Sequence, residues 1–266
     1  MSTMPMSTAL RSVRPSWSFL GLLAVAVGGV AMLSMSSGQS GQAIGGMWLL
    51  ILGGWLVSLC LHEFAHAFTA YRYGDHSSEL RGYLTLDPLK YTHPGLSLVL
   101  PVLIILIGGI GFPGGAVYLN TAGMTPTQRS RVSLAGPTTN LILGVILLLI
   151  VRFLPESQST GNLAAGLTFL AFLQVTAAIL NLIPMPGFDG YGALEPYLSP
   201  QTRQSANKLA PFGFLVVFGL IFFVPPIAKA FFGLIYGIIG SFGVDVGLMA
   251  NAYRLFLFWE FLPGAR

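Results

Sequence analysis

The stretch Ile44–Tyr71, which reads IGGMWLLILGGWLVSLCLHEFAHAFTAY, decides the fold class of this chain. It is almost entirely apolar, and its ionisable side chains gather near its C-terminal end. A run of about 20 apolar residues is long enough to cross the hydrocarbon core of a bilayer as a helix. We therefore expect Ile44–Tyr71 to be a membrane-spanning helix that carries its ionisable residues close to one membrane surface.

The composition of the whole chain agrees with this interpretation. Of its 266 residues, 54% are hydrophobic and 8% are charged, whereas a soluble domain carries about 25% charged residues. So few charges cannot cover a water-facing surface, and the composition excludes an ordinary soluble enzyme as well as a disordered chain. Lys and Arg form no run of the kind that binds nucleic acid, so we expect no nucleic-acid partner.

Other apolar stretches predict further spans, at Trp17–Leu33, Val132–Val151, Leu163–Ile183, Ala210–Val224 and Ile227–Phe242. A shorter stretch, Leu96–Ile110, is bordered and interrupted by Gly and Pro, which is typical of a re-entrant segment. The predicted fold class is an all-α polytopic membrane protein with about six transmembrane helices, one re-entrant segment and short β-like stretches near the site. We expect one domain, residues 1–266, with a core at 44–200 and peripheral helices at 17–33 and 210–242.

The positions of Lys and Arg predict the orientation of the spans, because cytoplasmic loops are rich in both residues. With the N-terminus inside and six crossings, only Arg152 and Lys229 of the 13 Lys and Arg residues lie outside. This count places both termini and the ionisable end of Ile44–Tyr71 in the cytosol. The first span resembles a signal peptide, but we expect it to remain, because a polytopic protein needs no separate signal.

The ionisable residues of Ile44–Tyr71 form the pattern H-E-x-x-H, from His62 to His66. Residues i and i+4 of a helix lie on one face, about 5–6 Å apart, so the two imidazoles can bind one zinc ion. Glu63 lies beside them, where it can act as a general base without being a ligand. The alternative is a group of polar side chains that only joins neighbouring helices.

A catalytic zinc ion takes three protein ligands and keeps one position open, so a third ligand is needed. The best candidate is Asp189, in the stretch NLIPMPGFDG from Asn181 to Gly190. Its prolines end the preceding helix and its glycines permit a sharp turn, so that the carboxylate can fold back into the bundle. The charge count places Asp189 on the same side of the membrane as His62. The alternative is that Asp189 is only a turn residue.

Together, these motifs resemble the site-2 protease family of intramembrane zinc metallopeptidases, the M50 type. That family combines H-E-x-x-H in a membrane helix with a later N-x-x-P-x-P-x-x-D-G, and this chain has both. Gly136–Asn140 is similar to the family's G-P-x-x-N feature, and Gly82–Pro88 resembles a G-x-L-T-L-[ND]-P stretch of its small bacterial members. The resemblance covers Gly53–Tyr197 and is to a small member without PDZ or CBS domains. Phe188 departs from the aliphatic residue that the family usually has there.

The resemblance implies one Zn²⁺ per chain, held by His62, His66 and Asp189, with Glu63 as the catalytic base. It also implies that Asn181 holds the scissile carbonyl or the developing oxyanion. The implied enzyme is a zinc metalloendopeptidase that cleaves transmembrane segments of single-span membrane proteins. Its site would lie near the cytosolic side of a bacterial cell membrane.

Several points stay open at the level of sequence. Asn140 could serve catalysis, or it could join helices by hydrogen bonds. Tyr83–Leu86 or Gly115–Asn120 could offer an extended edge to which an unwound substrate adds as a strand. An inactive zinc-binding scaffold is one alternative function, although a scaffold has no need for a base such as Glu63. A metal transporter is another, but it leaves the turn around Asp189 unexplained.

Overall fold

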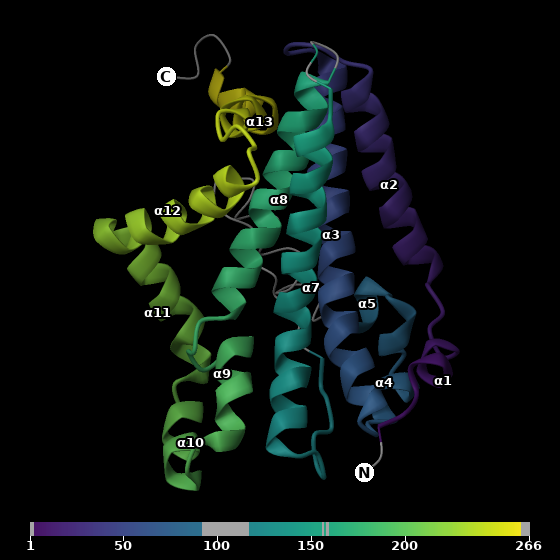
Figure 1. Cartoon of the computed structure of the whole chain (residues 1–266), viewed down its shortest axis with the longest axis vertical. Helices are drawn as coiled ribbons and strands as arrows, with labels where there is room; N and C mark the ends of the chain where they lie inside the picture. Colours follow the sequence, from purple (N-terminus) through teal and green to yellow (C-terminus); the bar gives the residue numbers. More distant parts are fainter. Residues whose placement is uncertain (1–2, 92–116, 156, 158–159, 262–266) are drawn as a thin grey trace.

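Long helices lie side by side along the long axis of the computed structural model (Figure 1). The structure describes residues 3–91, 117–155, 157 and 160–261. Every regular element in these residues is a helix, so the predicted all-α class is confirmed. The helices long and apolar enough to cross a membrane are α2 (Trp17–Ser34), α3 (Gly41–Arg72), α7 (Pro126–Phe153) and α8 (Gly161–Asn181).

These helices begin and pack as their sequences lead one to expect. Ser16, Ser40 and Thr125 cap the N-termini of α2, α3 and α7, because each side-chain oxygen accepts a backbone N–H of the first turn. Glycines let α2 and α3 approach closely: a Cβ at Gly53 would lie 2.9 Å from the backbone nitrogen of Ala26. α8 is enclosed by its neighbours, and 89% of its most apolar 18-residue stretch is buried.

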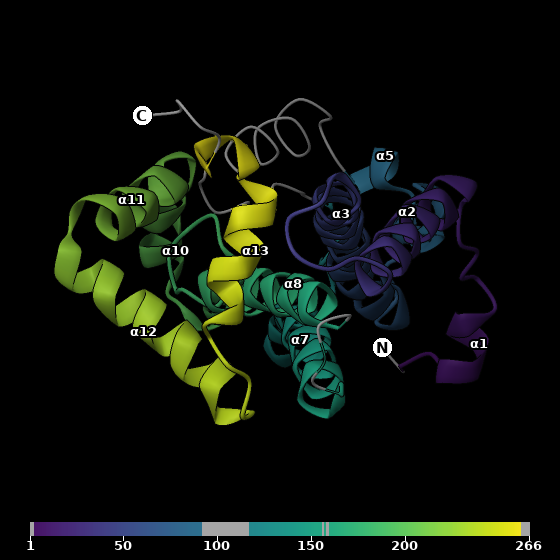
Figure 2. The same ribbon diagram turned by 90° about the horizontal axis from the view of Figure 1, so that it is seen from above.

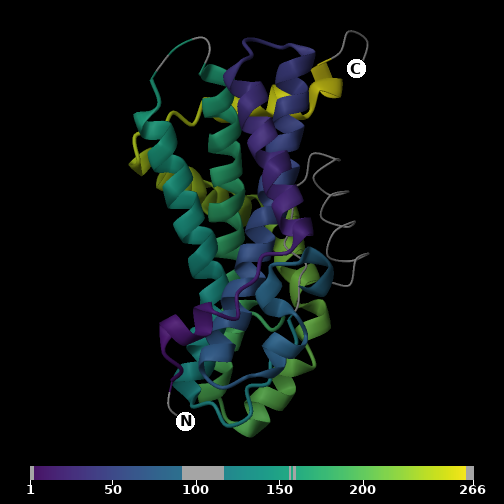
Figure 3. The same cartoon turned by 90° about the vertical axis from the view of Figure 1, so that its right-hand side faces the viewer.

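Short helices gather at the end of the bundle where α3 ends and α7 begins, which we call the α9 end (Figures 1 and 3). They are α1 (Met6–Leu10), α4 (Ser77–Leu80), η1 (Tyr83–Thr85), α5 (Pro88–Tyr91), α9 (Asp189–Leu194), η3 (Glu195–Tyr197) and α10 (Pro200–Asn207). The remaining helices are α11 (Ala210–Phe223), α12 (Pro225–Ser241), α13 (Leu248–Phe256) and η4 (Phe258–Phe261). α13 lies at the opposite end, which we call the α13 end.

The predicted fifth and sixth spans correspond to α11 and α12, which lie to one side of α7 and α8 (Figure 2). Their 14 and 17 residues extend about 21 and 26 Å at 1.5 Å per residue, less than the about 30 Å of a hydrocarbon core. The helix breaks at Val224, because the ring of the following proline disfavours the helical conformation at this residue. Four helices, or five if α10 and α11 count as one span bent by 66°, meet the length requirement among the described residues. The count of six is therefore not confirmed.

The prediction that the N-terminal segment and Arg254 lie on the same side is wrong. Met4 N–H donates to the carbonyl of Arg72 at 2.9 Å, which places the N-terminal segment at the α9 end. The indole N–H of Trp48 donates to the carbonyl of Phe256 at 3.1 Å, which places α13 and Arg254 at the other end. The cause is that α11 and α12 together lead the chain once from the α9 end to the α13 end (Figure 1), whereas the charge count assumed two crossings.

The predicted re-entrant segment, Leu96–Ile110, lies outside the described residues. Tyr83–Leu86 is not an extended edge, because η1 is a 3₁₀ helix and the residues on either side of it, Gly82 and Leu86, have left-handed φ angles of 77° and 57°. Of the second predicted edge, residues 117–120 are described and have no regular structure.

Candidate metal centre

The residues of the H-E-x-x-H motif lie in the buried, C-terminal part of α3. His62, Glu63 and His66 are only 4%, 3% and 6% exposed. α7 crosses this face of α3 at Gly136, where a Cβ would lie 2.6 Å from His62 Nε2 and closer still to His66 Nε2. The missing side chain of Gly136 therefore leaves open the space between the two imidazoles.

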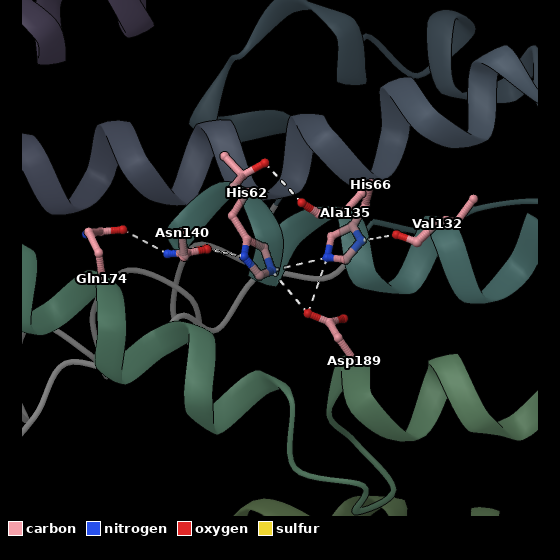
Figure 4. Close-up of polar contacts among 8 residues, drawn as sticks. His62, His66, Val132, Ala135, Asn140, Gln174 and Asp189 are labelled. Atoms are coloured by element: carbon pink, nitrogen blue, oxygen red, sulfur yellow. Dashed lines mark hydrogen bonds and ion pairs between the residues drawn. The ribbon is translucent and has the colours of Figure 1, made fainter. Parts of the chain in front are cut away.

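Asp189 reaches the imidazoles because the chain turns sharply after α8. α8 ends at Asn181, and Gly187 continues the turn with a left-handed φ of 102°. A Cβ at Gly190 would overlap the carbonyl of Leu182, so the turn can be this tight only with glycine there. Asp189 is the first residue of α9 and points back toward α3 (Figure 4).

The three predicted ligands converge on one point. Asp189 Oδ2 lies 3.3 Å from the Nε2 atoms of both His62 and His66, and these two nitrogens are 3.1 Å apart. A tetrahedral zinc site with bonds of about 2.0–2.1 Å has ligand atoms about 3.3 Å apart. Asp189 Oδ2 is also buried without a hydrogen-bond partner, as expected for an atom that serves as a metal ligand. The donor set therefore fits a zinc ion.

Hydrogen bonds behind the imidazoles fix their orientation. His66 Nδ1 lies 2.7 Å from the backbone carbonyl of Val132, and His62 Nδ1 lies 2.5 Å from Asn140 Oδ1 (Figure 4). Both partners are acceptors, so each Nδ1 carries the ring proton and each Nε2 presents its lone pair to the shared point. Histidines that bind metals commonly donate their other ring N–H in this way.

The carboxylate of Asp189 is held in its ionised form. Burial raises the pKa of this group, but the two adjacent imidazoles, His66 above all, outweigh that effect. The pKa of Asp189 therefore lies below its usual range, and an ionised carboxylate is the form that binds a cation.

A cavity of about 350 Å³ opens beside the three ligands. Its walls include every residue predicted to serve the site, namely His62, Glu63, His66, Asn181 and Asp189, and also Val117 and Leu119. The backbone N–H of Val117 faces the carboxylate of Glu63 across the cavity. Asn140 lies behind His62 and is absent from the cavity wall, which favours a supporting role over contact with substrate.

The sequence analysis missed two residues behind the site, Gln174 and Ser58. Gln174 on α8 accepts from Asn140 Nδ2 at 2.8 Å and donates to Ser58 at 2.8 Å. A signal was present, because a glutamine within an apolar span needs polar partners on neighbouring helices. Those partners could not be identified without the packing of α3, α7 and α8.

Comparison with known proteins agrees with this geometry. The sequence model of peptidase family M50 matches residues 50–164. The chain is 51% identical over 251 residues to Rip2 of Mycolicibacterium smegmatis, which is designated a zinc metalloprotease; the match covers 94% of this chain and 96% of Rip2. The chain belongs to peptidase family M50.

Other M50 relatives support the same assignment. Rip2 of Mycobacterium tuberculosis is 52% identical over 254 residues, which are 94% of this chain and 96% of the relative. YwhC of Bacillus subtilis, also designated a zinc metalloprotease, is 31% identical over 182 residues, which are 65% of this chain and 80% of the relative. No solved structure matches significantly. This M50 protein is therefore a membrane zinc metalloprotease. The resemblance to the site-2 protease family is confirmed. The same relatives favour a peptidase over the transporter and the inactive scaffold.

Proposed function

We propose that this zinc metalloprotease is an intramembrane endopeptidase that cleaves transmembrane segments of single-span membrane proteins. One observation carries the proposal: the H-E-x-x-H motif lies inside α3, a helix that is apolar enough to cross a membrane. His66 precedes Arg72, the last residue of α3, by six positions, and so lies about 9 Å along the axis from the polar end of the helix. A peptide bond that reaches this site must come from within or just below the membrane surface.

His62, His66 and Asp189 would hold the zinc ion. A bound zinc ion supplies a Lewis acid and makes water nucleophilic at neutral pH. Glu63 then accepts a proton from the attacking water and returns it to the leaving amine. Glu63 is buried and lines the cavity, where its carboxylate faces the backbone N–H of Val117.

Asn181 donates from its side-chain amide to the carbonyl oxygen of the scissile bond, where negative charge develops. Two observations support this role: Asn181 is the last residue of α8, and it lines the same cavity as Glu63. Residues 117–120 run along that cavity without regular structure. Backbone groups of residues 118–119 would pair with an unwound substrate, whereas the N–H of Asn120 already donates to Asp75 Oδ2 at 3.0 Å.

We further propose that the α9 end faces the cytosol of a bacterial cell and that residues 1–266 form one protease domain. Most Lys and Arg residues of the described chain belong to this end, namely Arg11, Arg14, Arg72, Arg81, Lys90, Arg129, Arg131, Arg203 and Lys208. The positive-inside rule assigns such an end to the cytoplasm. α11 and α12 would then form one broken crossing.

The test compares two forms of one peptide in proteoliposomes that contain the purified enzyme. One form carries a single transmembrane segment, and the other carries the same scissile sequence in a soluble flank. We expect zinc-dependent cleavage within the membrane segment only. Cleavage of the soluble form at an equal rate would contradict an intramembrane site.

A further inference from the structure

A row of buried polar side chains leads from His62 into the apolar interior of the bundle (Figure 4). Asn140 Nδ2 donates to Gln174 Oε1 at 2.8 Å, and Gln174 Nε2 donates to Ser58 Oγ at 2.8 Å. We call Asn140, Gln174 and Ser58 the amide relay. Its members are 4%, 1% and 5% exposed and come from α7, α8 and α3. An unsatisfied polar group at such a depth is costly, so these bonds are strongly favoured.

The direction of the amide relay is set at its far end by a backbone group. The hydroxyl of Ser58 donates to the carbonyl of Trp55 at 2.8 Å, and that carbonyl can only accept. A hydroxyl has one proton, so toward Gln174 the oxygen of Ser58 can only accept. Gln174 must therefore turn its NH₂ group to Ser58 and its oxygen to Asn140.

The orientation of Gln174 fixes that of Asn140 and, through Asn140, the tautomer of His62. Because Gln174 offers an oxygen, Asn140 must turn its NH₂ group to Gln174 and its own oxygen to His62. That oxygen accepts from Nδ1 of His62, so the ring proton stays on Nδ1 and the lone pair of Nε2 faces Asp189. A flipped Asn140 amide would offer a donor to Nδ1 and would move the ring proton to Nε2, where zinc binds.

The orientation of His66 does not depend on a side-chain amide. Its Nδ1 faces the backbone carbonyl of Val132, which belongs to α7 and cannot reverse its direction. The side-chain amide of Asn140 has two nearly isosteric orientations, and only its second partner distinguishes them. The two ligands on α3 are therefore oriented by different means, one by the backbone and one through the amide relay.

We propose that Gln174 is a positioning residue of the metal centre, which fixes the amide orientation of Asn140 and thereby the tautomer of His62. The proposal rests on the zinc-binding role proposed above for His62. Gln174, in the interior of α8, would then influence zinc affinity, although it touches neither the ligands nor the cavity.

The test substitutes Gln174→Leu in the full chain and measures the zinc dissociation constant by chelator competition from the zinc-loaded protein. Loss of a partner behind a metal-binding histidine typically weakens metal binding about 10–100-fold, and we expect about tenfold here. Asn162→Leu is the matched control. Asn162 is a buried amide on the same helix that donates to Ser36 and Gly38 at the α13 end. The Asn162→Leu variant should lose about as much folding stability as Gln174→Leu, but its zinc affinity should equal that of wild type.

A second variant and a spectroscopic measurement separate positioning from general stability. In Gln174→Glu, a buried neutral carboxyl still offers an acceptor to Asn140 and a proton to Ser58. We expect its zinc affinity to stay within threefold of wild type. In zinc-free protein labelled with ¹⁵N-histidine, His62 should be the Nδ1–H tautomer in wild type and in Gln174→Glu, and a mixture in Gln174→Leu.

The outcomes distinguish this proposal from the proposed function. If Gln174→Leu binds zinc as tightly as wild type, or if Asn162→Leu weakens binding equally, the positioning role is overturned while the zinc site stands. If Gln174→Glu binds zinc as weakly as Gln174→Leu does, the proposed direction of the hydrogen bonds in the amide relay is overturned. If the wild-type protein itself binds no zinc, the proposed zinc site is overturned, and the positioning role with it.

Discussion

Asp189 Oδ2 lies 3.3 Å from His62 Nε2, although one residue begins a short helix after α8 and the other lies deep in α3. Together with His66, these two side chains form a donor set that could hold one metal ion.

Glu63→Gln should keep zinc but lose proteolysis. The amide has nearly the shape of the carboxylate but cannot accept the proton of the attacking water, and general-base catalysis contributes about 10²–10⁴-fold. We expect the cleavage rate of a single-span peptide to fall at least about 100-fold, with zinc content by metal analysis unchanged. Retained proteolysis in the purified variant would rule out Glu63 as the base.

Asp189→Asn should lose zinc and activity together. The amide is a poorer ligand than an ionised carboxylate, and zinc sites are built from thiolate, imidazole and carboxylate groups. Zinc affinity should fall by more than the about 100-fold that loss of an outer hydrogen bond can cost. Asp245→Asn, a change on the loop before α13, serves as the control and should bind zinc normally. Normal zinc binding by Asp189→Asn would place the third ligand elsewhere.

Gly136→Ala should disrupt the metal centre without unfolding the protein. The added methyl would lie 2.6 Å from His62 Nε2, between the two ligands. We expect zinc affinity to fall about tenfold or more, as for other changes that displace a bound histidine. A Cβ at Gly144, on the same helix, would meet Val175 Cγ2 at 3.1 Å and Gln174 Cβ at 3.4 Å but neither imidazole, so Gly144→Ala should weaken zinc binding less than Gly136→Ala does. Equal zinc affinity in both variants would show that the imidazoles do not depend on this gap.

Residues on α10 and α13 should react from opposite sides of the membrane. In a Cys60→Ala background, Ser205→Cys and Asn251→Cys place single thiols on exposed positions of the two helices. A membrane-impermeant maleimide added to intact cells should label Asn251→Cys only, because Ser205 lies at the positively charged α9 end. Labelling of both or of neither would support the original expectation that the two segments share a side.

Proline at position 118 or 119 should slow cleavage. In an extended segment, successive residues point to opposite sides, and proline removes one backbone N–H at a time. The N–H of Asn120 already donates to Asp75 Oδ2, so we compare Tyr118→Pro with Leu119→Pro and expect the variant whose lost N–H faced the substrate to cleave more slowly while its zinc content stays normal. If both variants cleave as fast as wild type, substrate pairing along this segment must be abandoned.

Features that depend on local pattern could be predicted from the amino-acid sequence. The four long helices follow from apolar runs, because the length of such a run sets whether it can cross a bilayer. The spacing of His62 and His66 follows from the helical repeat, which holds in any fold. The prolines and glycines before Asp189 predicted a sharp turn because they restrict or free the backbone wherever they occur.

Features that depend on the relative placement of helices became known from the folded structure alone. The side of the bundle that α13 occupies depends on the path of α11 and α12, and a count of apolar stretches contains no such path. Asn140 could not be classed from sequence, because its partners, His62 and Gln174, belong to two other helices. Hydrogen bonds between side chains on different helices form only when packing brings their atoms within about 3 Å, and no local pattern encodes that distance.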